Sequence, residues 1–326
     1  MNSPVPALEV RGLTVEFPSR RATLTALSDV SLTIQPGEIL GVVGESGAGK
    51  SMTGMAVLGL LEPPGRIAAG EIRIAGTRTD TLDEKAMAKV RGRIVGAVFQ
   101  DPLTSLNPLF TVGQQLIETI RLHSRLDARD ARDRAVALLK QVGIPGAGER
   151  IDHYPHQFSG GMRQRVVIAL ALAGNPSLII ADEPTTALDV SIQAQITALL
   201  RQLCHEHGAG IMLVTHDMGV IAETADRVAV MYAGRVIEIG PVEEVVRHPR
   251  HPYTRGLMGA IPSLGARVAH LAQIDGAMPR LNRIPQGCAF NPRCPLAGPR
   301  CRRDRPSLVA DGASAAACWL LEGGVA

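Results

Sequence analysis

The sequence contains few aromatic residues and lacks any long apolar stretch. Phe, Trp and Tyr make up 3% of the 326 residues, whereas hydrophobic residues in all make up 45%. Aliphatic side chains must therefore form most of the core. No apolar run approaches the roughly 18 residues that a membrane-spanning helix needs. Any role at a membrane would have to come through a partner protein.

Strong charge and a targeting signal are also missing. The formal net charge of +3 is too small to indicate a nucleic-acid partner. The opening MNSPVPALEV lacks the basic and apolar segments of a signal peptide, so we expect a cytoplasmic protein. Four of the five cysteines lie within the last forty residues. In a reducing compartment such a group indicates a metal site before disulfide bonds.

A phosphate-binding loop is the clearest motif that is present. From Gly44 the chain reads G-x-x-x-x-G-K-S, with an apolar strand predicted at 38–43 and a helix at 50–61. Its glycines let successive N–H groups turn toward an anion, Lys50 reaches the β- and γ-phosphates, and the Ser51 hydroxyl can hold Mg²⁺. The expected nucleotide-binding residues are Gly44, Glu45, Ser46, Gly47, Ala48, Gly49, Lys50, Ser51 and Met52.

Polar residues follow three apolar strands of the predicted parallel sheet. They are Gln100 after 94–99, Asp182 and Glu183 after 177–181, and His216 after 211–215. The carboxyl edge of such a sheet is where open α/β folds bind ligands. Asp182 suits Mg²⁺ held through water, and Glu183 suits polarising the water that attacks the γ-phosphate. Gln100 can reach both the metal and that water.

Two further features allow more than one interpretation. Ser159, Gly160 and Gly161 open a helix predicted at 162–173, which by itself indicates only a helix cap. Phe17 ends one of two alternating strands upstream of the phosphate loop, and it is equally consistent with stacking on adenine and with core packing. Between the strands, residues 101–158 have the spacing of a helical insertion.

Together these motifs resemble the ATP-binding subunits of ABC transporters over roughly residues 7–255. The resemblance is carried by the phosphate loop, Gln100, SGGMRQR at 159–165, LIIADEP at 178–184, ALD at 187–189 and His216. It implies an α/β fold: a P-loop (RecA-like) ATPase core with an antiparallel β subdomain and a helical subdomain at about 101–165. The implied nucleotide-binding domain covers 1–255, and a small Cys-rich C-terminal extension covers 256–326.

The resemblance also implies how the site would work. In this family two ATPase subunits pair head to tail, so Ser159, Gly160 and Gly161 would contact the ATP held by the partner. Glu183 would be the general base, His216 the γ-phosphate sensor and Phe17 the adenine-stacking residue. Asp189 would bridge the two subunits, and Gln100 would link the site to a membrane partner.

One residue departs from the family pattern. The commonest signature has Gln where this chain has Met162. A thioether cannot replace the hydrogen bonds of an amide. The activity of the composite site that uses this signature is therefore open. The substitution favours a heterodimer with a distinct second ATPase over a self-pairing motor.

Longer motifs are similar to the dipeptide/oligopeptide importer branch of the family. They are QDPLTSLNP at 100–108, YPHQFSGGMRQRV at 154–166, IADEPTTALDV at 180–190 and RHPYT at 250–254. The branch implies two transmembrane permease subunits, an extracytoplasmic substrate-binding protein, no nucleic acid, and a peripheral place on the cytoplasmic face of the inner membrane. Nickel chelates or glutathione-like solutes are alternative cargoes, and a soluble non-transport ABC ATPase is the alternative function.

The cysteine-rich tail carries the last candidate site. Cys288, Cys294, Cys301 and Cys318 are spaced by 5, 6 and 16 residues, which fits neither the short pairs of zinc ribbons nor a ferredoxin pattern. A Pro- and Arg-rich segment of this kind could hardly fold without a staple. The peptide-importer resemblance favours a [4Fe–4S] cluster, with zinc or unmetallated thiols as the alternatives.

Overall fold

The computed structural model describes residues 5–20, 22–186, 188–260 and 273–321. Ala187 of the ALD motif, the first four residues and parts of the C-terminal extension lie outside the described residues. The chain forms two compact units. The first comprises residues 1–8, 34–39 and 73–214, and the second comprises residues 9–33, 40–72 and 215–326. In the parts of the chain described, no helix combines the length and apolarity that crossing a membrane requires.

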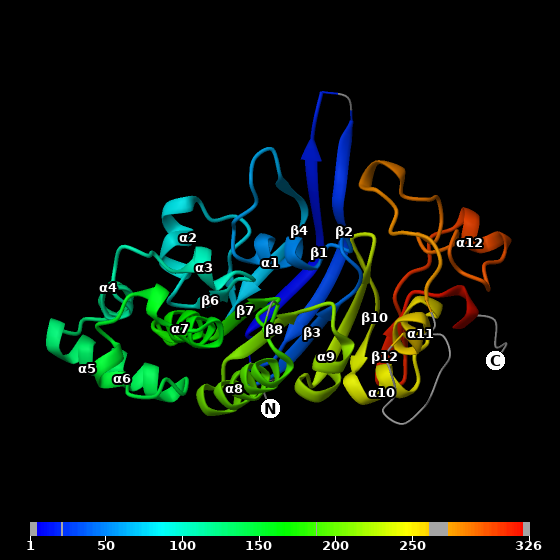
Figure 1. Cartoon of the computed structure of the whole chain (residues 1–326). Helices are drawn as coiled ribbons and strands as arrows, with labels where there is room; N and C mark the ends of the chain where they lie inside the picture. Colours follow the sequence, from blue (N-terminus) through cyan, green and yellow to red (C-terminus); the bar gives the residue numbers. More distant parts are fainter. Residues whose placement is uncertain (1–4, 21, 187, 261–272, 322–326) are drawn as a thin grey trace. The chain divides into compact units, whose positions relative to one another are not determined.

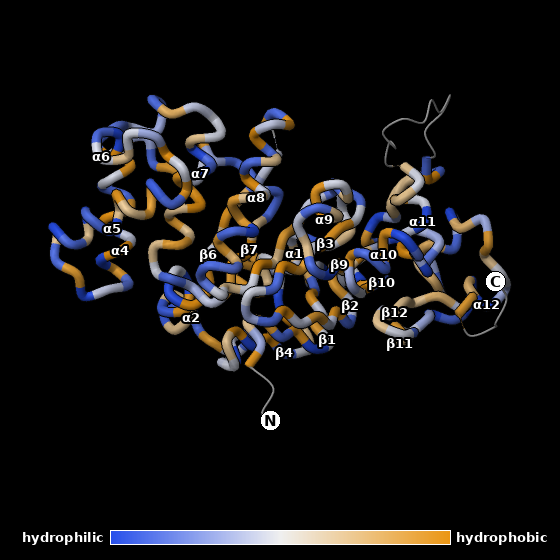
Figure 2. The backbone as a smooth tube through the Cα atoms, turned by 90° about the horizontal axis from the view of Figure 1, so that it is seen from below, coloured by the Kyte–Doolittle hydropathy of each residue, from blue (hydrophilic) through white to orange (hydrophobic). Residues whose placement is uncertain are grey.

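The first unit contains a parallel sheet of three short strands. They are β6 (Val95–Val98), β7 (Leu178–Asp182) and β8 (Gly210–Val214), in the order β8-β7-β6. Every residue of β8 is buried, and β7 is buried up to its last residue. Strand β8 is apolar throughout its length and β7 is apolar up to Asp182, as a parallel sheet covered on both faces requires. The orange colour of β6 and β7 in Figure 2 shows the same composition.

Helices dominate the rest of the first unit, together with the two-residue strand β5 (Thr77–Arg78), which pairs with Arg73 and Ile74. They are α2 (Glu84–Val90), α3 (Pro102–Ser105), α4 (Val112–His123), α5 (Ala128–Gln141), α6 (Ala147–Arg150), η1 (Pro155–Gln157), α7 (Gly160–Leu172) and α8 (Val190–His207). Helices α4, α5 and α7 pack against one another (Figure 1). Thr111 and Gln114 form a capping box that begins α4.

The second unit contains the rest of the β-structure. One group consists of β1 (Leu8–Pro18), β2 (Thr23–Ile34) and β4 (Arg66–Ile74), in the order β2-β1-β4. The other consists of β3 (Ile39–Val43), β9 (Arg227–Tyr232), β10 (Arg235–Pro241), β12 (Ser314–Ala316) and β11 (Val309–Asp311), in that spatial order. Strand β3 is buried at every position and pairs in parallel with β9.

The helices of the second unit are short. They are α1 (Lys50–Val57), α9 (Met218–Thr224), α10 (Val242–Arg247), α11 (Pro252–Gly259), η2 (Leu281–Arg283), α12 (Pro299–Arg303) and η3 (Trp319–Leu321). Helix α1 is shorter than the predicted 50–61. It ends at Val57 because Gly59 adopts a φ of 63°, the left-handed conformation that terminates helices.

The C-terminal segment is joined to β10 of the same unit. Strand β12 pairs antiparallel with β10 at Glu238 and Ile239, and Arg250 forms an ion pair with Asp311. The Glu238 carboxylate is fully buried and accepts the backbone N–H groups of Arg250 and His251, at 2.8 and 2.9 Å. Burial raises the pKa of Glu238. The start of α11 is thereby tied to β10.

His251 caps α11 as a buried neutral base. Its Nδ1 accepts the Tyr253 N–H at 3.0 Å, and burial lowers the pKa of the imidazole from an ordinary 6.5 to about 3. Between these two values the unfolded chain binds a proton that the folded chain does not. The contribution to stability is therefore complete above pH 6.5 and is lost as the pH falls from 6.5 toward 3.

We expect the substitution His251→Asn to weaken this pH dependence, because Asn can still cap the helix but does not titrate. Below pH 6.5 the slope of the unfolding free energy against pH should fall by up to about 1.4 kcal/mol per pH unit. Urea unfolding at pH 7.5, 6.0 and 5.0 measures this slope, with the substitution of the exposed His156 by Asn as the control. Equal slopes in His251→Asn and the unsubstituted protein would contradict the assignment.

Candidate functional site

The phosphate loop connects β3 to α1 within the second unit. Gly44, Gly47 and Gly49 have φ values of 152°, 81° and 104°, which L-residues rarely adopt. A β-carbon at Gly44 would collide with the carbonyl oxygen of Met231. Gly49 is the N-cap of α1 and has no side-chain acceptor for the first amides of the helix. Such amides suit an anion.

Lys50 is held inside the loop. Its side chain is buried, and its Nζ donates to the carbonyl oxygens of Gly44 at 2.8 Å and Glu45 at 3.1 Å. Of the other predicted loop residues, Ala48 is buried, Met52 is half-buried, and Ser46 and Ser51 are exposed. The loop therefore has a closed shape centred on the ammonium group of Lys50.

Two residues of the second unit that sequence reasoning missed contact Glu45 of the loop. Arg293 donates to both carboxylate oxygens, at 2.9 and 3.0 Å, and the Glu45 N–H donates to the Tyr253 hydroxyl at 2.9 Å. Burial raises the pKa of Tyr253, so this hydroxyl stays neutral at ordinary pH. Tyr253 lies in the RHPYT motif and Arg293 in the sequence NPRCP. Neither sequence indicates by its spacing that these residues contact the phosphate loop.

The predicted acidic pair stands at the end of β7 in the first unit. Glu183 has a φ of 48°, and its N–H donates to the Val214 carbonyl oxygen at 2.8 Å. Its Oε2 accepts Gln100 Nε2 at 3.2 Å and the Thr186 hydroxyl at 2.8 Å. The structure thus brings Gln100 and Glu183 together, at the ends of the neighbouring strands β6 and β7. Asp182, the residue before Glu183, is half-buried.

The serine–glycine segment begins α7 in the first unit. The Ser159 hydroxyl accepts the Met162 N–H at 3.4 Å, and Gly160 is the first helical residue, two residues earlier than predicted. Ser159 and Gly160 are exposed and Gly161 is half-buried. The Met162 sulfur accepts Arg150 Nη1 at 3.3 Å. The start of this helix is accessible to a ligand from outside the chain.

The remaining predicted residues belong to different surroundings. Asp189 is exposed and is the N-cap of α8 in the first unit. His216 is exposed in the second unit, directly before the N-cap residue of α9. Phe17 is half-buried, and its ring carbon Cε1 would lie 2.7 Å from a β-carbon at Gly65. The Phe17 ring therefore packs on the backbone of a turn in its own unit.

The four tail cysteines lie within electrostatic reach of one another in the second unit. Burial raises the pKa of the Cys288 thiol to about 11 and also raises the pKa values of Cys294 and Cys318. Three of the sulfurs accept the backbone N–H two residues further along the chain, at Phe290, Leu296 and Leu320. Among the described residues, no group of three or more His, Cys, Asp or Glu side chains is placed to hold a metal ion.

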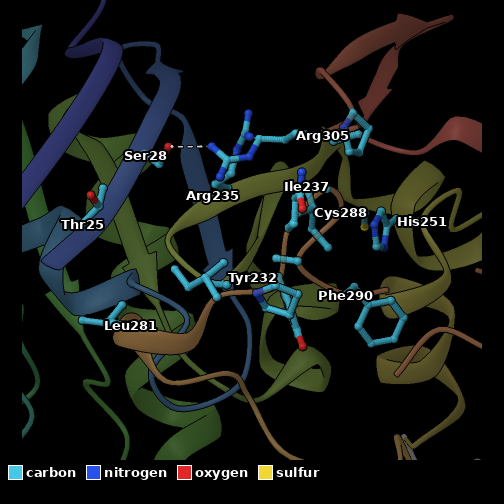
Figure 3. Close-up of a pocket in the computed structure, with 18 of the residues that line it drawn as sticks. Thr25, Ser28, Tyr232, Arg235, Ile237, His251, Leu281, Cys288, Phe290 and Arg305 are labelled. Atoms are coloured by element: carbon cyan, nitrogen blue, oxygen red, sulfur yellow. Dashed lines mark hydrogen bonds between the residues drawn. The ribbon is translucent and has the colours of Figure 1, made fainter. Parts of the chain in front are cut away.

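Cys288 also lines a cavity of about 420 Å³ in the second unit (Figure 3). Arg235 and Arg305 lie along the same cavity, and Arg305 donates to the Ser28 hydroxyl at 3.3 Å. Burial and the neighbouring Arg305 lower the pKa of Arg235. The cavity is therefore electropositive on one side, and the cysteine segment (residues 286–318) forms another wall through Cys288 and its neighbours.

Two family models match the chain. The model described as ABC transporter matches residues 27–186, which contain the phosphate loop, Gln100, the serine–glycine segment and the acidic pair. The model described as "Oligopeptide/dipeptide transporter, C-terminal region" matches residues 237–301, which contain Tyr253, Arg293 and three of the four tail cysteines.

Curated relatives resemble the chain over nearly its whole length. A protein of Brucella melitensis is 49% identical over 93% of this chain and 94% of its own length, and one of Brucella ovis is 48% identical over the same shares. A protein of Brucella abortus is 46% identical over 96% of this chain and 94% of its own length. Each is named "Putative peptide import ATP-binding protein".

Solved structures of ABC transporter ATPases are also similar to this chain. The dimeric post-hydrolysis structure of the ATP-binding cassette MJ0796 bound to ADP and Pi is 32% identical, with a TM-score of 0.64 over 72% of this chain and 98% of that chain. The cbiO1 protein of Clostridium perfringens, part of the ABC transporter complex cbiONQ, is 30% identical, with a TM-score of 0.65 over 74% and 91%. The chain belongs to the ATP-binding subunits of the ABC transporter family and has their P-loop ATPase fold.

Proposed function

We propose that this chain is the ATP-hydrolysing motor of an importer for di- and oligopeptides. The observation that carries the proposal is the match of residues 237–301 to the C-terminal region of oligopeptide/dipeptide transporters. The names of relatives aligned over more than nine-tenths of the chain support the same substrate class. The assembly would contain two transmembrane permease subunits and an extracytoplasmic binding protein, with this chain peripheral on the cytoplasmic face of the inner membrane.

The family resemblance assigns each predicted residue a role in the chemistry. Lys50 would exchange the loop carbonyl oxygens for the β- and γ-phosphates of ATP, and the Ser51 hydroxyl and Gln100 would hold Mg²⁺, with Asp182 acting on it through water. Glu183 would polarise the attacking water. Two donors on one oxygen fix the orientation of its carboxylate, which supports this role. His216 would sense the γ-phosphate, and Phe17 would stack on adenine.

A second ATPase subunit would complete the site. Ser159, Gly160 and Gly161 would contact the partner's ATP through the start of α7, whose exposure supports that role, and Asp189 would bridge the subunits. The sulfur of Met162 accepts a hydrogen bond from Arg150 of its own chain. Because a thioether donates no hydrogen bond to a nucleotide, we propose a heterodimer with a partner that carries its own signature.

We expect Glu183→Gln to abolish turnover while ATP remains bound. An amide keeps the shape and can still accept from Thr186, but it cannot take a proton, so kcat should fall by at least about 100-fold. Phosphate release and a nucleotide-binding titration measure the two effects. Turnover within twofold of the unsubstituted protein would overturn the assignment of the base.

The same variant tests the cargo in living cells. Chromosomal Glu183→Gln should abolish uptake of a radiolabelled dipeptide and leave uptake of the free amino acid unchanged. Loss of nickel or glutathione uptake with normal dipeptide uptake would assign the alternative cargo. Unchanged uptake of every solute would support the soluble, non-transport ATPase instead.

We also propose that Cys288, Cys294, Cys301 and Cys318 hold a [4Fe–4S] cluster, with zinc as the alternative metal. Four thiols within electrostatic reach support the donor set, and three backbone N–H groups directed at sulfur would favour the thiolate form that a metal needs. The thiols as placed do not form a metal-binding group, so the site would have to tighten on loading. A structural role for the tail follows, since a bound metal would tie four separate segments together.

Metal analysis of anaerobically purified protein tests this proposal. We expect about four irons and four acid-labile sulfides per chain, as a [4Fe–4S] composition requires, and their loss in Cys288→Ser. Buried Cys204→Ser, outside the tail, is the matched control. One zinc per chain would replace the cluster by the alternative, and no metal in the unsubstituted protein would refute both.

A further inference from the structure

We infer that Arg293 is a positioning residue for nucleotide binding, which holds the phosphate loop in shape by clasping Glu45. The two residues are 248 positions apart in sequence and belong to the same compact unit. Both terminal nitrogens of the guanidinium donate to the carboxylate, at 2.9 and 3.0 Å. This two-pronged geometry is the strongest form of a carboxylate ion pair.

Arg293 is itself fixed by its surroundings. Its side chain is only 7% exposed. It donates to the carbonyl oxygens of Asp275, Ile274 and Gly276, at 2.8, 3.2 and 3.4 Å. A side chain with so many partners has little freedom left to lose, so it can hold Glu45 at small entropic cost.

Aromatic rings form the support behind the guanidinium. Tyr232, Tyr253 and Phe290 contact one another edge to face, with ring centroids 4.7 to 5.4 Å apart. Arg293 lies 5.9 Å from the centroids of both Tyr232 and Phe290. The cluster joins the end of β9, the start of α11 and the cysteine segment in one rigid group.

Glu45 passes this constraint into the loop. Arg293 holds the Glu45 carboxylate. The Glu45 N–H donates to the Tyr253 hydroxyl, and the Glu45 carbonyl oxygen accepts a hydrogen bond from Lys50 Nζ. The residue is therefore fixed at its side chain, its amide and its carbonyl. A second contact lies close by, since a β-carbon at Gly47 would be 3.9 Å from the Met278 Cγ. The C-terminal segment therefore contacts the loop through Arg293.

The ion pair between Glu45 and Arg293 affects ATP binding through the charge of the phosphate loop. A loop built to receive a triphosphate gains nothing from an unpaired carboxylate, because like charges repel at short range. Arg293 neutralises Glu45 and also keeps the loop from rearranging. Without it, ATP would meet both a negative charge and a less ordered loop, and both effects weaken binding before they affect the chemical step.

Titration of the purified full-length chain with a fluorescent ATP analogue tests the inference, together with steady-state ATPase kinetics. We expect Arg293→Ala to raise the Kd by about tenfold, the effect of losing one charge-assisted contact, with the loss falling on KM rather than kcat. Arg293→Lys should recover part of the affinity, since it keeps the charge without the two-pronged geometry. Exposed Arg302→Ala, in the same segment, should bind ATP like the unsubstituted chain.

A double-mutant cycle separates this pair from general damage. Glu45→Ala breaks the pair from the loop side and leaves Arg293 its carbonyl contacts, so it tests the same link if Arg293→Ala fails to fold. The double variant should bind ATP no more weakly than Arg293→Ala alone, because both changes remove one interaction. Unchanged affinity in Glu45→Ala, additive losses in the double variant, or an equal loss in Arg302→Ala would overturn the inference.

Discussion

The ion pair between Glu45 and Arg293 is the constraint on which the phosphate loop depends. Glycines allow the loop to curve, but the same freedom makes its ordering costly. The loop is therefore held by residues outside it as well as by Lys50. Arg293 binds the Glu45 carboxylate, and the Tyr253 hydroxyl accepts the Glu45 N–H. Two of the residues that hold the loop, Arg293 and Tyr253, therefore lie outside the phosphate-binding motif itself.

In the acidic pair of the first unit, local backbone conformation and two side-chain donors orient the Glu183 carboxylate. Glu183 follows Asp182, the last residue of an otherwise apolar strand, and adopts a left-handed conformation in which its N–H donates to the Val214 carbonyl oxygen. Non-glycine residues in this conformation carry strain, which accumulates where function requires a particular side-chain direction. Gln100 and Thr186 then set the direction of the carboxylate.

The cysteine segment balances two opposing influences. Burial raises the pKa values of Cys288, Cys294 and Cys318 and favours their neutral form, whereas backbone N–H groups directed at the same three sulfurs favour the thiolate. Arg293 stands directly before Cys294 in this segment.

Local sequence was sufficient to indicate the apolar strands and the family. The apolar runs that became β3, β7 and β8 and the glycine spacing of the loop are local patterns, and the family could be named from them. Only tertiary structure decided that Arg293 and Tyr253 hold Glu45, that Phe17 packs on Gly65, and how closely the cysteines approach one another. These contacts join positions far apart in the chain, and their pairing depends on how buried surfaces fit, which no periodicity or spacing records.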